Sequence, residues 1–151
     1  ASLQYLRLWI LGGSIMAEYL ANAVQTVELN QPIVFTASIP CTRGNVIHED
    51  ETGIFILRGN STNCFARYQV TFNGNIALPT GGTVGPISVA FSVGGSTVPA
   101  SAMEVTPAAV EQYFNISREM PVAIFCGCCQ TVTVTNTSDQ AILMKNATIE
   151  I

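Results

Sequence analysis

Residues 64–79 read CFARYQVTFNGNIALP, and this stretch shows the pattern that decides the fold class. From Phe65 onward the side chains alternate between two faces of an extended chain. The even-numbered face is apolar and aromatic, from Ala66 through Tyr68 and Val70 to Phe72, whereas Arg67 and its odd-numbered neighbours are mostly polar. A period of two residues is typical of a β-strand with one buried face.

The same period recurs on both sides of this stretch. It is present in residues 24–39 (VQTVELNQPIVFTASI), in the apolar segment 54–57 and in the final segment 130–151. Residues 87–101 (ISVAFSVGGSTVPAS) predict a hairpin, because Gly94-Gly95 permits the positive φ of a tight turn. Loops rich in Ser, Asn and Gly recur about every 8–12 residues, which predicts an all-β sandwich or barrel of about ten strands.

Composition places the chain among globular proteins with few charges. Its 151 residues correspond to one domain, and 48% of them are hydrophobic. Only 11% are charged, compared with about 25% in average soluble domains. We therefore expect a surface covered by uncharged polar side chains, or surface buried in an oligomer.

Charge and hydropathy exclude two classes of partner. The net charge is −4 and the six basic residues are scattered, so no cluster is present to bind a nucleic-acid backbone. No run reaches the about 18 apolar residues that a membrane-spanning helix needs. We expect neither a nucleic-acid partner nor a membrane span.

The first residues, ASLQYLRLWILGGSIM, differ from the rest. The apolar run Leu8–Leu11 is too short for a signal peptide, and no small-x-small cleavage site follows it. Gly12-Gly13 followed closely by Met16 is what a ribosome-binding sequence would give if it were translated in frame. We expect residues 1–15 to be an N-terminal extension (a translated upstream sequence, a fusion or an anchor) and residues 16–151 to form a single domain.

Five cysteines raise the question of a metal or redox centre: Cys41, Cys64, Cys126, Cys128 and Cys129. A structural zinc site usually needs four ligands, commonly in two closely spaced pairs, and a thioredoxin-like CxxC needs a βαβ setting; the sequence provides neither. We expect small buried side chains, or one or two disulfides joining Cys41 or Cys64 to the CGCC cluster. Because the number is odd, at least one thiol is free or links two chains.

A second polar group, His48-Glu49-Asp50-Glu51, is a weak candidate for binding a cation. The DxDxDG spacing of a calcium loop is absent, and His48 is the only histidine. A solvated turn is the favoured interpretation. Motifs of nucleophilic, metalloprotease and nucleotide-binding sites are also absent, so we expect no enzyme activity and no cofactor.

Four stretches together resemble the C1q/TNF-like jelly roll. They are residues 22–36 (NAVQTVELNQPIVFT), 45–59 (NVIHEDETGIFILRG), 87–101 and 130–151 (QTVTVTNTSDQAILMKNATIEI). The nearest resemblance is to the bacterial and phage versions at the C-termini of collagen-like surface proteins such as BclA. Residues 58–70 (RGNSTNCFARYQV) depart from that pattern, being longer and carrying a cysteine, and residues 1–21 show no collagen-like Gly-X-Y repeat.

The resemblance implies a compact homotrimer in which each jelly roll presents an apolar sheet face to its neighbours. Candidate interface residues are Tyr68, Val70, Phe72, Val132 and Val134. It also implies a non-enzymatic structural or adhesive module displayed on a phage virion, a spore or a bacterial surface. The alternative is a soluble ligand that binds a receptor protein or a glycan through loops such as residues 60–63 and 80–86.

Overall fold

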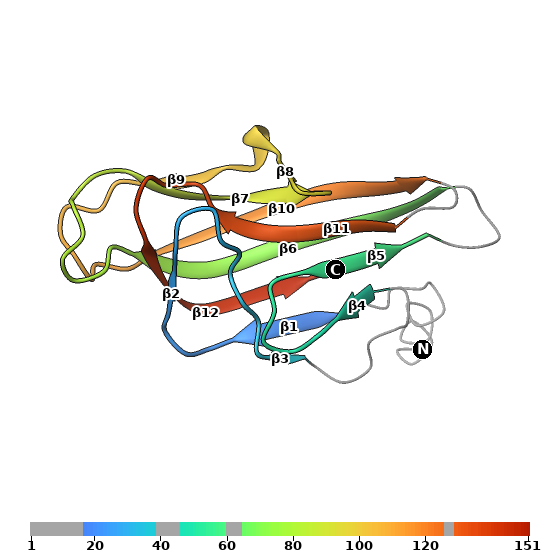
Figure 1. Cartoon of the computed structure of the whole chain (residues 1–151), viewed down its shortest axis with the longest axis horizontal. Coiled ribbons are helices and arrows are strands. Elements are labelled where there is room, and N and C mark those ends of the chain that lie inside the picture. Colours follow the sequence, from blue (N-terminus) through green and yellow to red (C-terminus); the bar gives the residue numbers. More distant parts are fainter. Residues whose placement is uncertain (1–16, 39–45, 60–64, 126–128) are drawn as a thin grey trace, which may run out of the picture.

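A computed structural model describes residues 17–38, 46–59, 65–125 and 129–151 (Figure 1). These residues form an all-β fold, as the period of two predicts, with twelve described strands in place of the expected ten or so. One turn of 3-10 helix, Pro99–Ser101, accompanies them. No helix in these ranges is long and apolar enough to cross a membrane.

Two antiparallel sheets, here called sheet A and sheet B, contain all the strands. Sheet A has the order β10-β6-β12-β1-β3, with β2 also paired to β12. Its strands are β1 (Glu18–Ala21), β2 (Gln25–Val27), β3 (Ala37–Ser38), β6 (Phe65–Ala77), β10 (Phe114–Phe125) and β12 (Ile142–Glu150).

Sheet B has the order β4-β5-β11-β7-β8, with β9 also paired to β7. Its strands are β4 (Val46–His48), β5 (Phe55–Arg58), β7 (Ile87–Val93), β8 (Ser96–Thr97), β9 (Met103–Val105) and β11 (Cys129–Asn136). The chain passes repeatedly from one sheet to the other, so strands adjacent in sequence, such as β11 and β12, lie in different sheets. This crossing pattern makes a closed sandwich of the jelly-roll type.

The core lies between the two sheets and consists of side chains from alternate positions. Its largest fully buried members include Phe35, Phe55, Phe72 and Phe91. The ring of Phe35 packs edge-on against Phe55 at 5.4 Å and against Phe72 at 6.4 Å between ring centroids. Edge-to-face contacts of this kind stabilise a core beyond the burial of area alone.

Four of the five expected interface residues belong to this core, which corrects that expectation. Val70, Phe72, Val132 and Val134 are all 0% exposed within a single subunit. The other sheet of the same chain already covers them, so they cannot contact a second copy. Tyr68, the fifth, is partly buried, and its hydroxyl donates a hydrogen bond to the carbonyl oxygen of Arg58.

The predicted hairpin is confirmed at β7 and β8. Gly94 and Gly95 have φ values of +62° and +87°, and the two strands pair from Val93↔Ser96. Left-handed backbone at both turn positions favours glycine, because a side chain there would be strained.

Three loops gather at one end of the sandwich (Figure 1). They are residues 78–86 between β6 and β7, 106–113 between β9 and β10, and 137–141 between β11 and β12. Hydrogen bonds link them: the Glu111 amide donates to the Leu78 carbonyl at 2.8 Å, and the Thr83 amide donates to the Gln140 side chain at 2.9 Å. We call this end of the sandwich the loop end.

Candidate functional site

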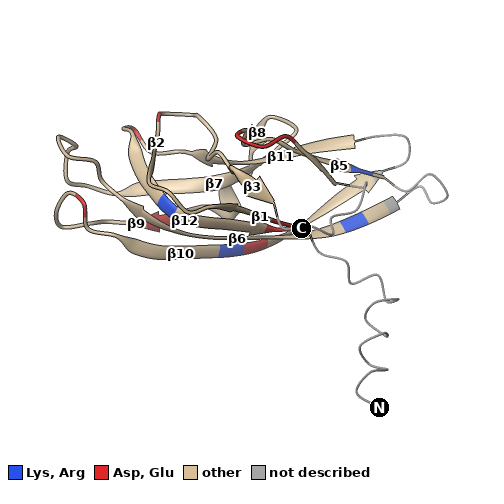
Figure 2. Cartoon of the chain, turned by 90° about the horizontal axis from the view of Figure 1, so that it is seen from below, with Lys and Arg blue, Asp and Glu red and all other residues tan. Residues whose placement is uncertain are grey.

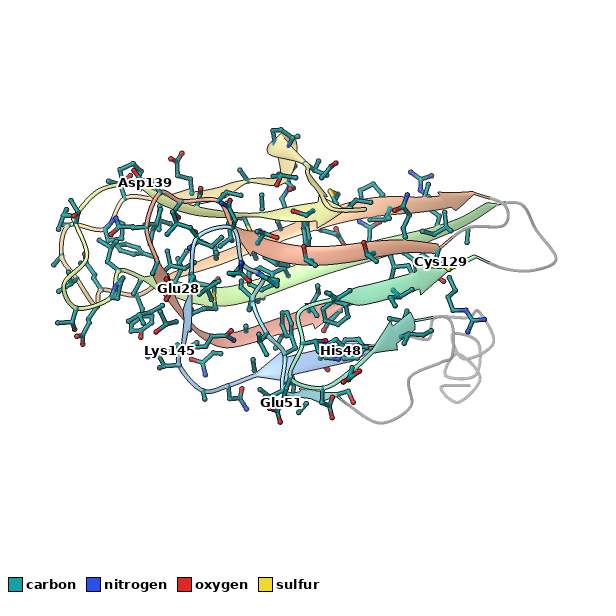
Figure 3. The ribbon with its side chains drawn as sticks, in the orientation of Figure 1. Glu28, His48, Glu51, Cys129, Asp139 and Lys145 are labelled. Atoms are coloured by element: carbon teal, nitrogen blue, oxygen red, sulfur yellow. The ribbon has the colours of Figure 1, made fainter. Side chains whose placement is uncertain are left out.

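His48 lies at the end of β4 with its ring directed into the sandwich (Figure 3). The ring stacks on Phe55 at 4.3 Å with an angle of 14° between the planes, and it contacts Tyr19 at 4.8 Å. Its Nε2 lies 2.9 Å from the carbonyl oxygen of Thr52, so Nε2 carries the proton and donates. The buried Nδ1 has no hydrogen-bond partner among the residues that the structure describes.

The three acidic residues that follow His48 do not join it in a site. Glu49, Asp50 and Glu51 are exposed and form a turn, in which the Thr52 hydroxyl donates to the Glu49 carbonyl at 2.7 Å. Within the described ranges no three His, Cys, Asp or Glu side chains gather as metal ligands would. The structure shows residues 49–51 as an exposed turn, with the His48 ring directed into the sandwich, and the weak cation site stays a prediction.

The cysteine cluster is described only in part. Cys129 is exposed at the start of β11, paired across the sheet with Arg58 of β5. Figure 3 shows it at the end of the sandwich opposite Asp139. The other four, Cys41, Cys64, Cys126 and Cys128, lie outside the described residues, so the expected disulfides stay a prediction.

The face of sheet A that points away from the core is formed by β1, β6, β10 and β12, and we call it the outer face (Figure 2). Strand register and alternation place the following side chains on it: Glu18, Leu20, Arg67, Gln69, Thr71, Asn73, Asn75, Asn115, Ser117, Glu119, Pro121, Ala123, Leu143, Lys145, Thr148 and Glu150. Most of them are uncharged, which agrees with the low charge of the whole chain.

An acidic row crosses the outer face from strand to strand. Glu18 pairs directly with Glu150, Glu150 with Thr71, and Thr71 with Glu119. The Thr71 hydroxyl donates to the Glu119 carboxylate at 3.3 Å, whereas Glu18 and Glu150 have no partner in the described part of the chain. Like charges directly opposite each other destabilise a strand pair.

A group of amide side chains lies beside this row, toward the loop end. The Nδ2 atom of Asn115 donates to Asn73 Oδ1 at 3.0 Å and to Asn75 Oδ1 at 3.1 Å, and Asn75 donates to Asn146 at 3.3 Å. Asn146 has a φ of +51° and lies where the register between β12 and β6 shifts. The bulge there aims its amide at the neighbouring strand.

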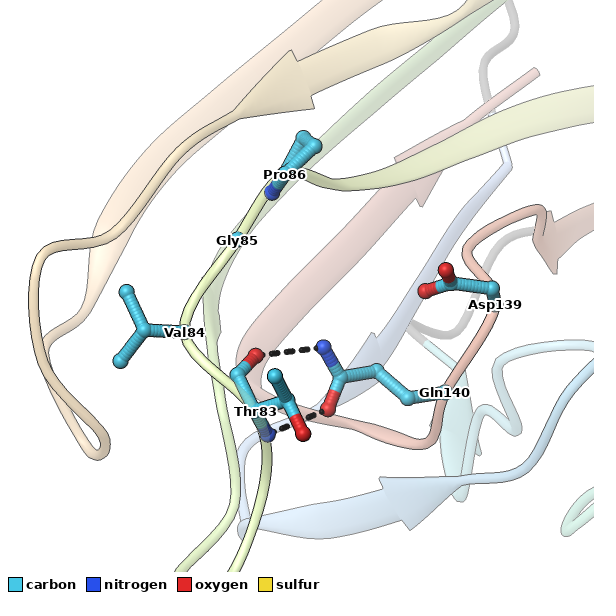
Figure 4. A pocket seen from close by; sticks show the side chains of 6 residues that line it. All are labelled: Thr83, Val84, Gly85, Pro86, Asp139 and Gln140. Atoms are coloured by element: carbon cyan, nitrogen blue, oxygen red, sulfur yellow. Dashed lines mark hydrogen bonds between the residues drawn. The ribbon is translucent and has the colours of Figure 1, made fainter.

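A pocket opens at the loop end between two connections (Figure 4). Its volume is about 310 Å³, and it is lined by Thr83, Val84, Gly85 and Pro86 from one loop and by Asp139 and Gln140 from the other. Of these six, the sequence directed attention only to the loop 80–86. Asp139 and Gln140 had no signal beyond belonging to a polar turn.

Gln140 joins the two walls of the pocket with a pair of hydrogen bonds (Figure 4). Its Nε2 donates to the Thr83 carbonyl at 2.7 Å, and its Oε1 accepts from the Thr83 amide at 2.9 Å. This close approach depends on Gly82, where an added Cβ would lie 3.1 Å from Gln140 Oε1 and 3.0 Å from the Pro79 carbonyl. The side chain of Gln140 thus holds the two loops together, and we call this pair of hydrogen bonds to Thr83 the Gln140 strut.

Comparison with known proteins gives structural neighbours but no sequence relatives. No protein-family model matches the chain, and no curated protein matches its sequence. The globular domain of zebrafish complement 1qA superposes with a TM-score of 0.59 at 10% identity, covering 90% of this chain and 94% of that one. The Eiger TNF from S. frugiperda gives 0.63 at 14% identity, covering 90% and 89%.

A third neighbour supports the same fold. Murine APRIL superposes with a TM-score of 0.52 at 8% identity, covering 90% of this chain and 98% of that one. At such low identities the likeness concerns the fold, and the similarity runs over nearly the whole of each chain. The chain therefore has the C1q/TNF-like jelly-roll fold, as the resemblance of its sequence predicts.

Proposed function

We propose that this chain is a non-enzymatic module that assembles as a homotrimer and attaches to a partner from the surface of a phage virion, a spore or a bacterial cell. Trimerisation brings three copies of each binding site together. Linked sites of this kind raise an affinity by about 10²–10⁴-fold without any new contact. Attachment through shape and avidity needs no reactive side chain.

The observation that carries the proposal is the chemistry of the outer face of sheet A. This face combines the acidic row with Arg67 and Lys145, and no ion pair joins the two sets in the described part of one subunit. Copies related by a three-fold axis would bring the acidic row of one subunit near basic side chains of the next. Complementary charge of this kind fixes orientation and register between subunits.

Apolar groups on the same face support a contact between copies. Leu20, Ala123 and Leu143 are half-buried on the outer face, and Pro121 is exposed on β10. Stable oligomer interfaces combine an apolar centre with a polar rim. The buried candidates from the sequence, on β6 and β11, are thus replaced by outer-face residues of β1, β10 and β12.

The environment of His48 supports a binding role over acid–base catalysis. It is the only histidine of the chain, and one ring nitrogen is engaged with the Thr52 carbonyl. The other faces the protein interior, where a substrate proton has no access. A general base must reach the proton that it takes, so this imidazole is unsuited to that task.

Surface labelling of the native particles tests the proposed role. Antibodies raised against the purified protein are applied to intact virions, spores and cells of the source, and to the same samples after permeabilisation. We expect label on intact particles. Label that requires permeabilisation in all three samples would contradict display on a surface.

A further inference from the structure

We propose that the pocket at the loop end binds a single neutral sugar ring through the Asp139 carboxylate. This inference deepens the proposed function and rests on it for its biological meaning. The pocket itself is formed within one subunit, because all six lining residues belong to one chain. Its binding chemistry can therefore be tested whether or not the chain trimerises.

The size of the pocket fits one ring. Its volume of about 310 Å³ lies at the lower end of small-molecule pockets, which span about 300–1,000 Å³. A longer oligosaccharide would place its other rings outside, along the surface of the loops. We therefore expect recognition of one terminal residue.

The polar chemistry of the pocket favours hydroxyl groups. Asp139 is exposed, and its carboxylate makes no hydrogen bond or ion pair within the described residues. A carboxylate accepts strong hydrogen bonds from neutral donors, and two adjacent hydroxyls can each donate to one of its oxygens. The side chain of Gln140, in contrast, is already occupied by the backbone of Thr83.

One lining residue offers an apolar contact to a sugar ring. Pro86 is exposed among the lining residues, whereas the side chain of Val84 points away from Asp139 and Gln140 (Figure 4). Specific small-molecule sites combine apolar contacts with a few placed polar groups. Among the described lining residues there is no Lys, Arg or His, so they offer no counter-charge to a phosphate or a sialic acid.

A divalent cation is a poorer occupant. Calcium takes about 6–8 oxygen ligands, and Asp139 is the one carboxylate among the lining residues. Within the described ranges, no three acidic, His or Cys side chains lie together as ligands of a metal ion would. One carboxylate among otherwise uncharged lining residues suits a neutral polyol better than a hard cation.

The pocket is held in shape before any ligand arrives. Besides the Gln140 strut, the Ser138 hydroxyl donates to the Ser88 carbonyl at 3.0 Å and accepts from the Ser88 amide at 2.8 Å. These contacts flank Asp139 on both sides in the sequence. A prearranged site loses less entropy on binding than a loop that must first become ordered.

The experiment is an NMR titration of the isotope-labelled full chain with methyl glycosides. The probes are the methyl glycosides of glucose, galactose, mannose, fucose and N-acetylglucosamine, each added to about 50 mM, which detects dissociation constants in the millimolar range. We expect at least one glycoside to shift the amides of residues 83–85, 139 and 140 together. If none of the five shifts these amides, or if the shifts lie elsewhere, the proposal is overturned.

Two variants with matched controls locate the binding. Asp139→Asn should weaken the glycoside at least about tenfold, corresponding to about 1.4 kcal/mol, whereas Asp50→Asn, the other aspartate of the chain, should leave it unchanged. Gly85→Leu should abolish binding without unfolding the chain, because a Cβ at Gly85 meets no atom within 4 Å. The exposed Ala100→Leu is its control. Equal affinity in Asp139→Asn and the parent chain would overturn the assignment.

The two proposals can fail separately. The mass in solution is measured on the sample used for titration. A trimer without glycoside shifts would overturn the sugar site and leave the attachment module standing. A monomer with the expected shifts would support the sugar site and contradict the trimer. Shifts with sialic acid or methylammonium alone would overturn the neutral-sugar assignment.

Discussion

The side chain of Asn136 donates a hydrogen bond of 2.9 Å to the carbonyl oxygen of Val27, 109 residues earlier in the chain. The bond joins the end of β11 in sheet B to the end of β2 in sheet A. The same Nδ2 donates to the Gln140 carbonyl at 3.0 Å, while Oδ1 accepts from the Ser138 amide at 2.8 Å. One fully buried amide thus connects the two sheets and shapes the turn that carries Asp139.

Asn136→Ala should destabilise the fold by about 2–4 kcal/mol, because it leaves buried carbonyl groups without donors. Urea unfolding followed by intrinsic fluorescence measures the change. The exposed Asn73→Ala is the control, with an expected loss below about 0.5 kcal/mol. If Asn136→Ala lowers the free energy of unfolding no more than the control does, the Asn136 amide does not stabilise the contact between the two sheets.

Two glycines should respond in opposite ways to the same substitution. A Cβ at Gly53 would lie 2.4 Å from the Ile33 carbonyl oxygen and 2.7 Å from Pro32 Cβ, so Gly53→Ala should destabilise the fold by about 1–3 kcal/mol. Gly85→Ala has open space and should be neutral or slightly stabilising. Thermal unfolding of both variants checks the prediction. If both melt at the same temperature, the packing around Gly53 is not as described.

His48 should act as a core aromatic. His48→Ala should cost about 2–4 kcal/mol, because it removes a ring that stacks on Phe55. His48→Phe should lose less than half as much, since it keeps the stack, removes the unpartnered Nδ1, and leaves the Thr52 carbonyl its hydrogen bond from the Phe35 amide at 3.0 Å. The exposed Glu49→Ala should change little. Chemical unfolding of the three variants gives their free energies of unfolding. If Glu49→Ala lowers the free energy of unfolding more than His48→Ala does, the ring of His48 is not a core aromatic.

The outer face of sheet A should be sensitive to a bulky charge. Ser117→Arg places a guanidinium on that face, next to Asn73 in the register, and should separate the subunits. Ser96→Arg places the same group on the exposed strand β8 of sheet B and should leave the assembly intact. Size-exclusion chromatography with light scattering distinguishes the two. Loss of assembly in Ser96→Arg but not in Ser117→Arg would assign the interface to the other sheet.

The fold class was predictable because a period of two is a local property of the chain. In β6 the alternation correctly separates Val70 and Phe72 from Arg67 and its polar neighbours. The alternation of residues does not indicate which element packs against the apolar face of a strand. In a two-sheet sandwich the partner is the other sheet of the same subunit, which is why Val132 and Val134 are core residues and not interface residues.

The candidate site was predictable only in part, because it depends on distant pairings. The loop containing Thr83 stands out by its glycines, but the strut to Gln140 spans 57 residues. Asn136 continues the buried positions of Val132 and Val134, where an amide contradicts the apolar pattern. The reason for this amide is its hydrogen bond to Val27 of β2, a contact that the sequence alone does not indicate. In residues 48–51 the sequence places a histidine beside three acids, but the fold directs the His48 ring into the sandwich and leaves the acids exposed in a turn.

Light scattering of the purified full chain at micromolar concentration measures whether the chain is a trimer. We expect three subunits of 16.1 kDa each, a mass of about 48 kDa. That mass should persist on tenfold dilution, as expected for a stable interface. A folded chain that remains at 16.1 kDa over the whole range would contradict the trimer, and with it the attachment by avidity that the proposed function requires.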